Sequence, residues 1–142
     1  MFALDPRLQQ DTLPMGDFPL CRLLLMNDAH YPWFILVPRR AAVSELFELD
    51  SLDQQALWQE SVGLAQILKD AFAADKINLA TLGNVVSQLH MHVIVRYHQD
   101  ATWPAPVWGK HPAEPYRAEQ VAAIRATLQR VMVGNFHFVE EV

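Results

Sequence analysis

Cysteine is nearly absent from this sequence of 142 residues, in which Cys21 is the only one. A single cysteine excludes a disulfide framework within the chain and is typical of a protein from a reducing cytoplasm. Cys21 lies in the apolar run LCRLLLM. Free cysteines are among the most buried residues, so we expect a buried thiol rather than a nucleophile.

The sequence also lacks long apolar runs and an excess of basic residues. No run approaches the roughly 20 apolar residues that span a membrane, and the N-terminus, with Asp5 and Pro6, does not resemble a signal peptide. The net charge of −5 opposes a surface for nucleic-acid polymers, which needs many Lys and Arg residues to displace counterions. We therefore expect a cytoplasmic protein with neither a membrane nor a nucleic acid as partner. A small phosphorylated ligand remains compatible, because one pocket needs only a few donors.

The chain does contain enough apolar material for one packed domain. Apolar residues make up 51% of it, which argues against disorder. A chain of about 150 residues can bury roughly 70% of the surface that its unfolded form exposes. The sequence shows no internal repeat, and we expect a single domain over residues 1–142.

Local patterns predict an α+β domain with an antiparallel sheet, one main amphipathic helix and a C-terminal helix. Ser51 and Gln54 fit a capping box at the start of the main helix. Gly134 and Asn135 can end the last helix in the left-handed conformation. After a short helix over 5–11, the expected order is β-β-α-β-β-α: strands over 20–26 and 33–37, a helix over 51–74, strands over 77–82 and 89–97, and a helix over 121–132.

The stretch QLHMHVIVRY, residues 88–97, places two histidines one residue apart in an apolar run. Side chains alternate between the faces of a strand, so Gln88, His90, His92 and Ile94 point one way. The residues between them are all apolar and belong against the helices. Burying two imidazoles is unfavourable unless each finds a hydrogen-bond partner. We therefore expect the polar row to line a cleft.

Two chemistries suit such a pair of histidines. His90 and His92 could bind a metal. His98 would point to the same side as a third ligand if the strand ran on. Metal sites usually add an acid or a cysteine, however, and the nearest acid, Asp100, lies beyond the expected strand end. Alternatively, one neutral imidazole attacks phosphorus while the second stabilises the phosphoryl oxygens. The residues by themselves leave both chemistries open.

The segment NLATLGNVVSQLHMHVIVR resembles the signature of the histidine triad (HIT) family of nucleotide hydrolases and transferases. That signature is His-φ-His-φ-His-φ-φ, where φ is apolar, and an arginine often follows. One of the three histidines is missing here. Gln88, His90 and His92 fill the three positions if Arg96 is the following arginine. The other alignment places Ile94 third and leaves the phosphate without a donor.

The resemblance implies that His90 is the nucleophile, that His92 binds phosphate, and that Gln88 replaces the first histidine. Gln88 can donate or accept a hydrogen bond but cannot become a cation. The implied reaction is a double displacement at the α-phosphate of a nucleotide conjugate, either a dinucleoside polyphosphate or a nucleoside phosphoramidate. It would pass through a covalent nucleotidyl-histidine in a homodimer, with neither a metal nor an organic cofactor. A metal-binding protein and a non-catalytic nucleotide-binding module are the alternatives.

Several polar side chains are candidates for contacts with the nucleotide. Asn84 lies in the turn before the histidine strand, where the family contacts phosphate. Asn27 and Asp28 follow the first strand, where the family places ribose and base contacts, and Asn78 opens the third strand. Each of these residues is also ordinary for a turn or a strand start. In the loop after the strand, Trp103 and Trp108 could stack on a base, but we expect them to close the core.

Overall fold

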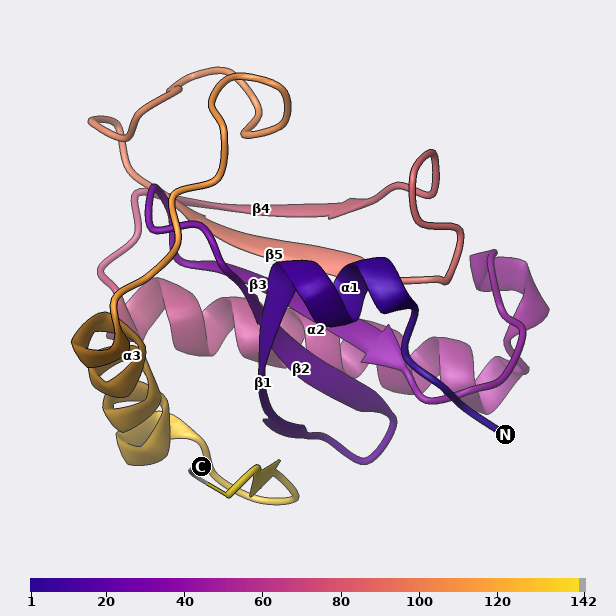
Figure 1. The fold of residues 1–142 in the computed structure, drawn as a ribbon. Coiled ribbons are helices and arrows are strands. Elements are labelled where there is room, and N and C mark those ends of the chain that lie inside the picture. The colour runs from indigo at the N-terminus through magenta and orange to yellow at the C-terminus, as the bar shows by residue number, and fades with distance from the viewer. Residues whose placement is uncertain (141–142) are drawn as a thin grey trace.

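The structure is a computed structural model that describes residues 1–140. Its centre is a six-stranded antiparallel sheet with the strand order β4-β5-β3-β2-β1-β6 (Figure 1). The strands are β1 (Thr12–Asp17), β2 (Cys21–Met26), β3 (Trp33–Pro38), β4 (Lys76–Thr81), β5 (Met91–Arg96) and β6 (His137–Phe138). The helices are α1 (Pro6–Asp11), the 3₁₀ turn η1 (Leu46–Glu48), α2 (Ser51–Ala71) and α3 (Ala118–Val131). The predicted α+β fold with an antiparallel sheet is confirmed.

The sheet packs a separate apolar cluster on each of its faces. On one face α2 buries Leu57, Leu64 and Leu68, which recur at helical spacing, against the strands. On the other face α1 buries Leu8 in a smaller cluster with residues of β2, β3 and β5. Figure 1 shows α1 in front of the sheet and α2 running behind it. The helix that covers the second face has only six residues, which is fewer than two turns.

The histidine strand alternates as predicted. Leu89, Met91, Val93 and Val95 belong to the cluster under α2, while Ile94 belongs to the cluster on the opposite face. β5 is central, since it pairs with both β3 and β4. It is shorter than the predicted strand, however, because it covers Met91–Arg96 instead of 89–97. His90 therefore lies immediately before the first paired residue, and residue 88 lies outside the strand.

Two strands were not predicted. The sequence of β1 contains Pro14 and Gly16, which normally argue against a strand interior. The register of β1 on β2 shifts between these two residues, as at a β-bulge. A side chain at Gly16 would place its Cβ 2.5 Å from the carbonyl oxygen of His137 in β6. The same glycine that obscures the strand in the sequence thus permits the close approach of β6.

The ends of the two long helices differ from the predicted ones. Asp50, rather than Ser51, caps α2, and its carboxylate accepts a hydrogen bond from the backbone N–H of Asp53. The predicted capping box is therefore wrong by one residue, because Asp is an equally good cap and stands first. The helix α3 ends at Val131, and Met132 is extended. Gly134 does adopt a left-handed φ of 79°, but in the turn that follows the helix.

A buried ion pair holds the loop that follows β5. Arg96 is 1% exposed, and its Nε donates to Oδ2 of Asp100 at 2.7 Å. A further N–H of Arg96 donates to the carbonyl oxygen of Ala105 at 2.8 Å. Burial raises the pKa of Asp100, but the hydrogen bond from Arg96, the backbone N–H groups of Tyr97 and Thr102 and the charge of Arg96 together more than offset it, so the pKa is lowered. This loop carries Trp108 back to the sheet.

Cys21 is buried, as predicted, with no exposed surface. Burial, and then the nearby Glu60 carboxylate, raise the pKa of its thiol. A raised pKa disfavours the thiolate, which is the reactive form. Among residues 1–140, no helix combines the length and the apolar character that a membrane crossing requires.

Candidate functional site

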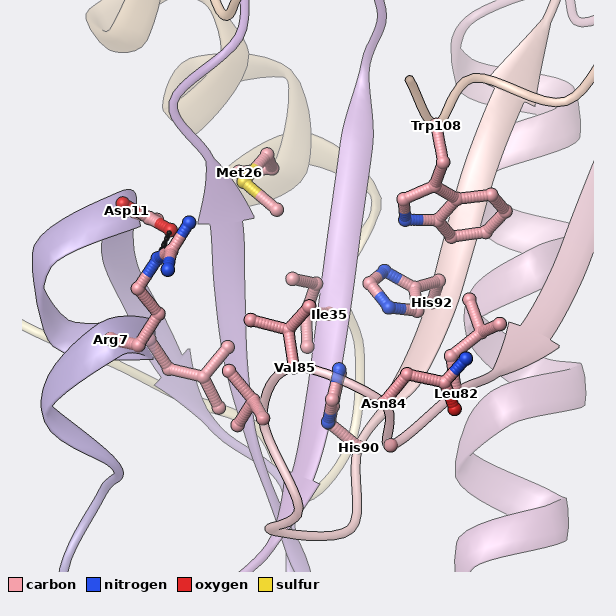
Figure 2. Close-up of a pocket in the computed structure, with 13 residues that line it drawn as sticks. Arg7, Asp11, Met26, Ile35, Leu82, Asn84, Val85, His90, His92 and Trp108 are labelled. Carbon is pink, nitrogen blue, oxygen red and sulfur yellow. Dashed lines mark hydrogen bonds and ion pairs between the residues drawn. The ribbon is translucent and has the colours of Figure 1, made fainter.

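The two histidines of the motif lie side by side in a cavity on the α1 face of the sheet (Figure 2). Their ring centroids are 4.8 Å apart and the ring planes are inclined by 70°. His90 is 5% exposed and His92 is 4% exposed. The cavity has a volume of about 360 Å³, within the lower range of small-molecule sites. The prediction that this row lines a cleft therefore agrees with the structure for both histidines.

The hydrogen bond of His90 determines which of its nitrogens is free. Nδ1 of His90 lies 2.7 Å from the carbonyl oxygen of Gln88. A carbonyl oxygen can only accept, so the proton of the neutral imidazole sits on Nδ1. Nε2 then carries an unshared electron pair. The backbone at His90 is held in addition by Thr81, whose hydroxyl donates to the His90 carbonyl oxygen at 2.7 Å.

His92 has the opposite arrangement. The indole Nε1 of Trp33 donates to Nδ1 of His92 at 2.9 Å. An indole N–H can only donate, so Nδ1 of His92 is unprotonated and the imidazole proton sits on Nε2. Two neighbouring histidines are therefore fixed as different tautomers: His90 offers an electron pair at Nε2, and His92 offers an N–H at Nε2.

His92 is held in the neutral form by its surroundings. Burial, and then the proximity of His90, lower the pKa of His92 from 6.5 to about 3. The ring centroid of Trp108 lies 5.0 Å from that of His92, and the rings meet edge to face. Protonation at Nδ1 would also place an N–H against the N–H of Trp33. His92 is thus a neutral hydrogen-bond donor at ordinary pH.

Four residues were candidates for polar contacts with the nucleotide. Within residues 1–140, only Asn84 of these four lies in the cavity of the histidines. It lies in the loop between β4 and β5 and lines the same cavity, beside Leu82 (Figure 2). Val85 and Val86 of the same loop also line it. The loop therefore supplies one amide and an apolar rim.

The other candidates serve the fold and do not line this cavity. The side-chain oxygen of Asn27 accepts from the backbone N–H of Tyr116 at 2.8 Å. The carboxylate of Asp28 lies 2.6 Å from Nδ1 of His30. Asn78 accepts from Arg96 at 2.8 Å. The structure thus places Asn27 beside the loop that follows β5, Asp28 beside His30, and Asn78 beside the end of β5, although all three were expected near the nucleotide.

Gln88 also points away from the cavity. Its Oε1 accepts from the backbone N–H of Asp5 at 2.9 Å, and its Nε2 donates to the carbonyl oxygen of Ala3 at 2.9 Å. Gln88 is not among the residues that line the cavity of the histidines. Both polar atoms of the side chain that replaces the first histidine are therefore committed to the N-terminal segment.

The wall opposite the histidines comes largely from α1. Leu8 is buried there, and Arg7 and Asp11 lie at its rim, where Nε of Arg7 donates to Oδ2 of Asp11 at 2.8 Å. Figure 2 shows this pair across the cavity from His92, with Ile35 between them. The site therefore has a polar histidine side and an apolar side that ends in an ion pair.

Sequence reasoning missed Trp33, Arg7 and Asp11 and expected Trp108 to close the core. Trp108 does pack on Trp33, but it also lines the cavity. The sequence did indicate that Trp33 shares a face with Ile35, because the two residues are two positions apart on one strand. Ile35 lies opposite His92 in the pairing of β3 with β5, and that register is not readable from the sequence.

The described residues contain no group of three His, Cys, Asp or Glu side chains arranged to hold a metal ion. His98, the third ligand of the metal-binding alternative, is directed elsewhere. Its Nδ1 lies 3.6 Å from the carboxylate of Asp75, and its ring packs on Trp103. Residues 1–140 therefore offer His90 and His92 no third ligand.

Solved structures of histidine triad proteins share this fold over nearly their whole length. A histidine triad protein from Marinobacter aquaeolei VT8 is 50% identical, with 92% of this chain and 96% of that chain covered and a TM-score of 0.90. One from Sinorhizobium meliloti 1021 is 47% identical, with 93% and 98% covered and a TM-score of 0.90. One from Bradyrhizobium japonicum is 42% identical, with 92% and 97% covered and a TM-score of 0.89. Among curated proteins, none matches this chain.

The fold and the paired histidines define a protein of the histidine triad class. The model of the HIT domain matches residues 7–99, which include all of α1 except Pro6, the strands β1–β5 and both histidines. This chain belongs to the HIT domain family. The family binds nucleotides, and the resemblance noted in the sequence is confirmed.

Proposed function

We propose that this protein cleaves a nucleotide conjugate at its α-phosphate through a covalent nucleotidyl intermediate on His90. The observation that carries the proposal is the pair of opposite tautomers. Nε2 of His90 has an electron pair because Nδ1 donates to Gln88 O, and Nε2 of His92 has a proton because Nδ1 accepts from Trp33. A nucleophile and an adjacent donor to the phosphoryl oxygen are the two groups that this reaction needs.

The first step forms a bond between Nε2 of His90 and the α-phosphorus and breaks the bond from phosphorus to the leaving group. The leaving group takes a proton from solvent as it departs. In the second step water attacks the same phosphorus, the P–N bond breaks, and His90 recovers its electron pair. One proton returns to solvent, so the sum is conjugate plus water to nucleoside monophosphate plus free leaving group.

His92 would stabilise both transition states without changing its charge. Its Nε2–H donates to a non-bridging oxygen, and Asn84 in the adjacent loop can supply a second donor. A donor that is already oriented and dehydrated stabilises developing charge without reorganisation. The low pKa of His92, about 3, keeps this donor neutral at ordinary pH.

The charge of the cavity favours a conjugate with an uncharged leaving group. Among the described residues that line it, Arg7 is the one Lys or Arg, and Asp11 neutralises it. A dinucleoside polyphosphate would bring several further negative charges, which this cavity does not match. The apolar rim of Leu82, Val85 and Trp108 suits an uncharged organic group instead. Nucleoside phosphoramidates are therefore the favoured class, and dinucleoside polyphosphates come second.

A homodimer is part of the proposal. Trp58 on α2 is 61% exposed, and Val62, one turn further along the helix, is also exposed. Leu79 is exposed on β4, which is an edge strand of the sheet. Exposed apolar side chains and an unpaired strand edge are features that a partner subunit would cover.

A substrate screen tests the proposed activity. Purified protein is incubated with nucleoside phosphoramidates and with dinucleoside polyphosphates, in the presence of a chelator, and nucleoside monophosphate is measured. We expect release from the phosphoramidates, unaffected by chelation. Absence of release with both classes, with nucleotide binding retained, would identify a non-catalytic nucleotide-binding module. Activity that requires an added metal would favour the metal-binding alternative.

A further inference from the structure

The backbone and the side chain of Gln88 act on opposite parts of the site. Its carbonyl oxygen orients His90, as described above. Its side chain binds the N-terminal segment at two points, the N–H of Asp5 and the carbonyl oxygen of Ala3, which lie 83 and 85 positions away in the sequence. One residue thus connects the nucleophile to the segment that enters α1.

The helix α1 needs such an attachment, because it has only six residues. Isolated helices of this length are not stable in water, so tertiary contacts must hold it. Asp5 caps α1 by accepting from the N–H of Arg7 at 2.8 Å, and the N–H of Asp5 itself donates to Gln88. Leu4 adds an apolar contact on the same face of the sheet. The side chain of Gln88 therefore fixes the residue that starts the helix.

The helix held in this way forms the side of the cavity that lies away from His92. Arg7, Leu8 and Asp11 line the cavity, and Figure 2 shows Arg7 and Asp11 on the side away from His92. A nucleotide whose phosphate lay at the histidines would extend its ribose and base toward this side. Leu8 and Ile35 offer apolar contact to a base, and one carboxylate oxygen of Asp11 is not used by Arg7.

We propose that Gln88 is a positioning residue for nucleoside binding, which acts by fastening α1 over the cavity, and that its side chain takes no part in phosphoryl transfer. This inference rests on the proposed nucleotide-conjugate function. The orientation of His90 depends on the carbonyl oxygen of Gln88, which every substitution at this position retains. Loss of the side chain should therefore weaken nucleoside binding and leave the chemical step intact.

Gln88→Met tests this role, because it keeps the length of the side chain and removes both polar atoms. Gln88→Glu is the second variant, since its carboxylate can still accept from Asp5 but cannot donate to Ala3. Gln66→Met is the matched control, because Gln66 lies on the exposed side of α2 and bonds only Asp70 among the contacts described. Circular dichroism melts establish that each variant is folded before kinetics are measured.

We expect Gln88→Met to raise KM for a nucleoside phosphoramidate roughly 10-fold, the effect of losing two ordinary hydrogen bonds, with kcat within about 2-fold. The KM of Gln88→Glu should lie between those of Gln88→Met and the wild type. The KM of Gln66→Met should match that of the wild type. Affinity for a nucleoside monophosphate should fall in parallel, while affinity for inorganic phosphate stays unchanged. Hydrogen exchange at the Asp5 amide should accelerate roughly 5-fold or more, because its only described acceptor is lost.

A fall in kcat with unchanged KM would overturn the inference, because it would make Gln88 a participant in the chemical step. An unchanged KM with faster exchange at Asp5 would overturn it as well, because α1 would then be loosened without consequence for the nucleoside. If wild-type protein binds no nucleoside monophosphate, the proposed function fails and the inference fails with it. If wild-type protein binds and turns over while Gln88→Met behaves identically, only the inference fails.

Discussion

The indole N–H of Trp33 donates to Nδ1 of His92 across the pairing of β3 with β5, at 2.9 Å. This bond places the imidazole proton of His92, a residue that lines the cavity, on Nε2. His90 carries its proton on the other nitrogen, because its Nδ1 donates to the carbonyl oxygen of Gln88. The different functions proposed for two identical side chains therefore follow from their different hydrogen-bond partners.

Trp33→Phe should lower turnover by about 5- to 10-fold, the equivalent of one hydrogen bond worth about 1 to 1.4 kcal/mol. Phenylalanine keeps the aromatic packing but removes the donor, so both tautomers of His92 become accessible. Nitrogen-15 NMR of the His92 ring should show the loss of the pure Nε2–H form. Trp103→Phe is the control, because Trp103 lies in the loop after β5 and does not line the cavity. Unchanged turnover together with an unchanged tautomer would show that Trp33 does not set the state of His92.

His92 should make the protein less stable in mild acid. Its folded-state pKa of about 3 lies below the unfolded value of 6.5, so the unfolded chain binds the extra proton between these values. The free energy of unfolding should therefore fall as the pH drops below 6.5, by roughly 2 kcal/mol at pH 5, since one unit of pKa corresponds to about 1.4 kcal/mol.

Denaturant unfolding at several pH values between 7.5 and 5 measures this slope. His92→Gln has no titrating group at the position, so the difference between wild type and variant isolates the contribution of His92. The variant should show a shallower dependence on pH. Parallel curves for the two proteins would mean that the pKa of His92 is the same in the folded and unfolded states, against the lowered pKa that keeps the donor neutral.

His92→Ala should reduce turnover by something like 10²–10³-fold, the loss typical of one donor to a developing negative charge. His92 contributes a hydrogen bond to the transition state but forms no covalent bond, so residual turnover should persist above background. The KM should change less than kcat if the donor acts mainly in the transition state. Complete loss of turnover would instead give His92 a covalent role.

The parts of the fold that follow from local periodicity could be predicted, and the parts that depend on distant pairing could not. The alternation of Leu89, Met91 and Val93 with the two histidines identified the strand and its buried face. In contrast, β1 was missed because Pro14 and Gly16 oppose a strand locally, while its pairing with β2 and β6 stabilises it.

The residues of the candidate site also divide into those that local patterns predict and those that depend on distant contacts. His90 and His92 were predicted from their spacing and from the family resemblance, and Asn84 joins them in the cavity. The contact of Gln88 with Ala3 spans 85 positions, and no local pattern could predict it. Asn27 and Asp28 were expected near the nucleotide because of their place after the first strand, but backbone donors of the loop near Tyr116 occupy their oxygens.

The assignment of His90 as the nucleophile is tested most directly by mass spectrometry of a reaction quenched with acid-free denaturant, during turnover of a nucleoside phosphoramidate. We expect a nucleoside monophosphate adduct on the peptide that contains both histidines, and fragmentation should place it on His90. His90→Ala should form no adduct and lose turnover almost completely, yet still bind nucleotide, because His92 keeps its donor. An adduct on His92, or full activity in His90→Ala, would contradict the assignment of the nucleophile.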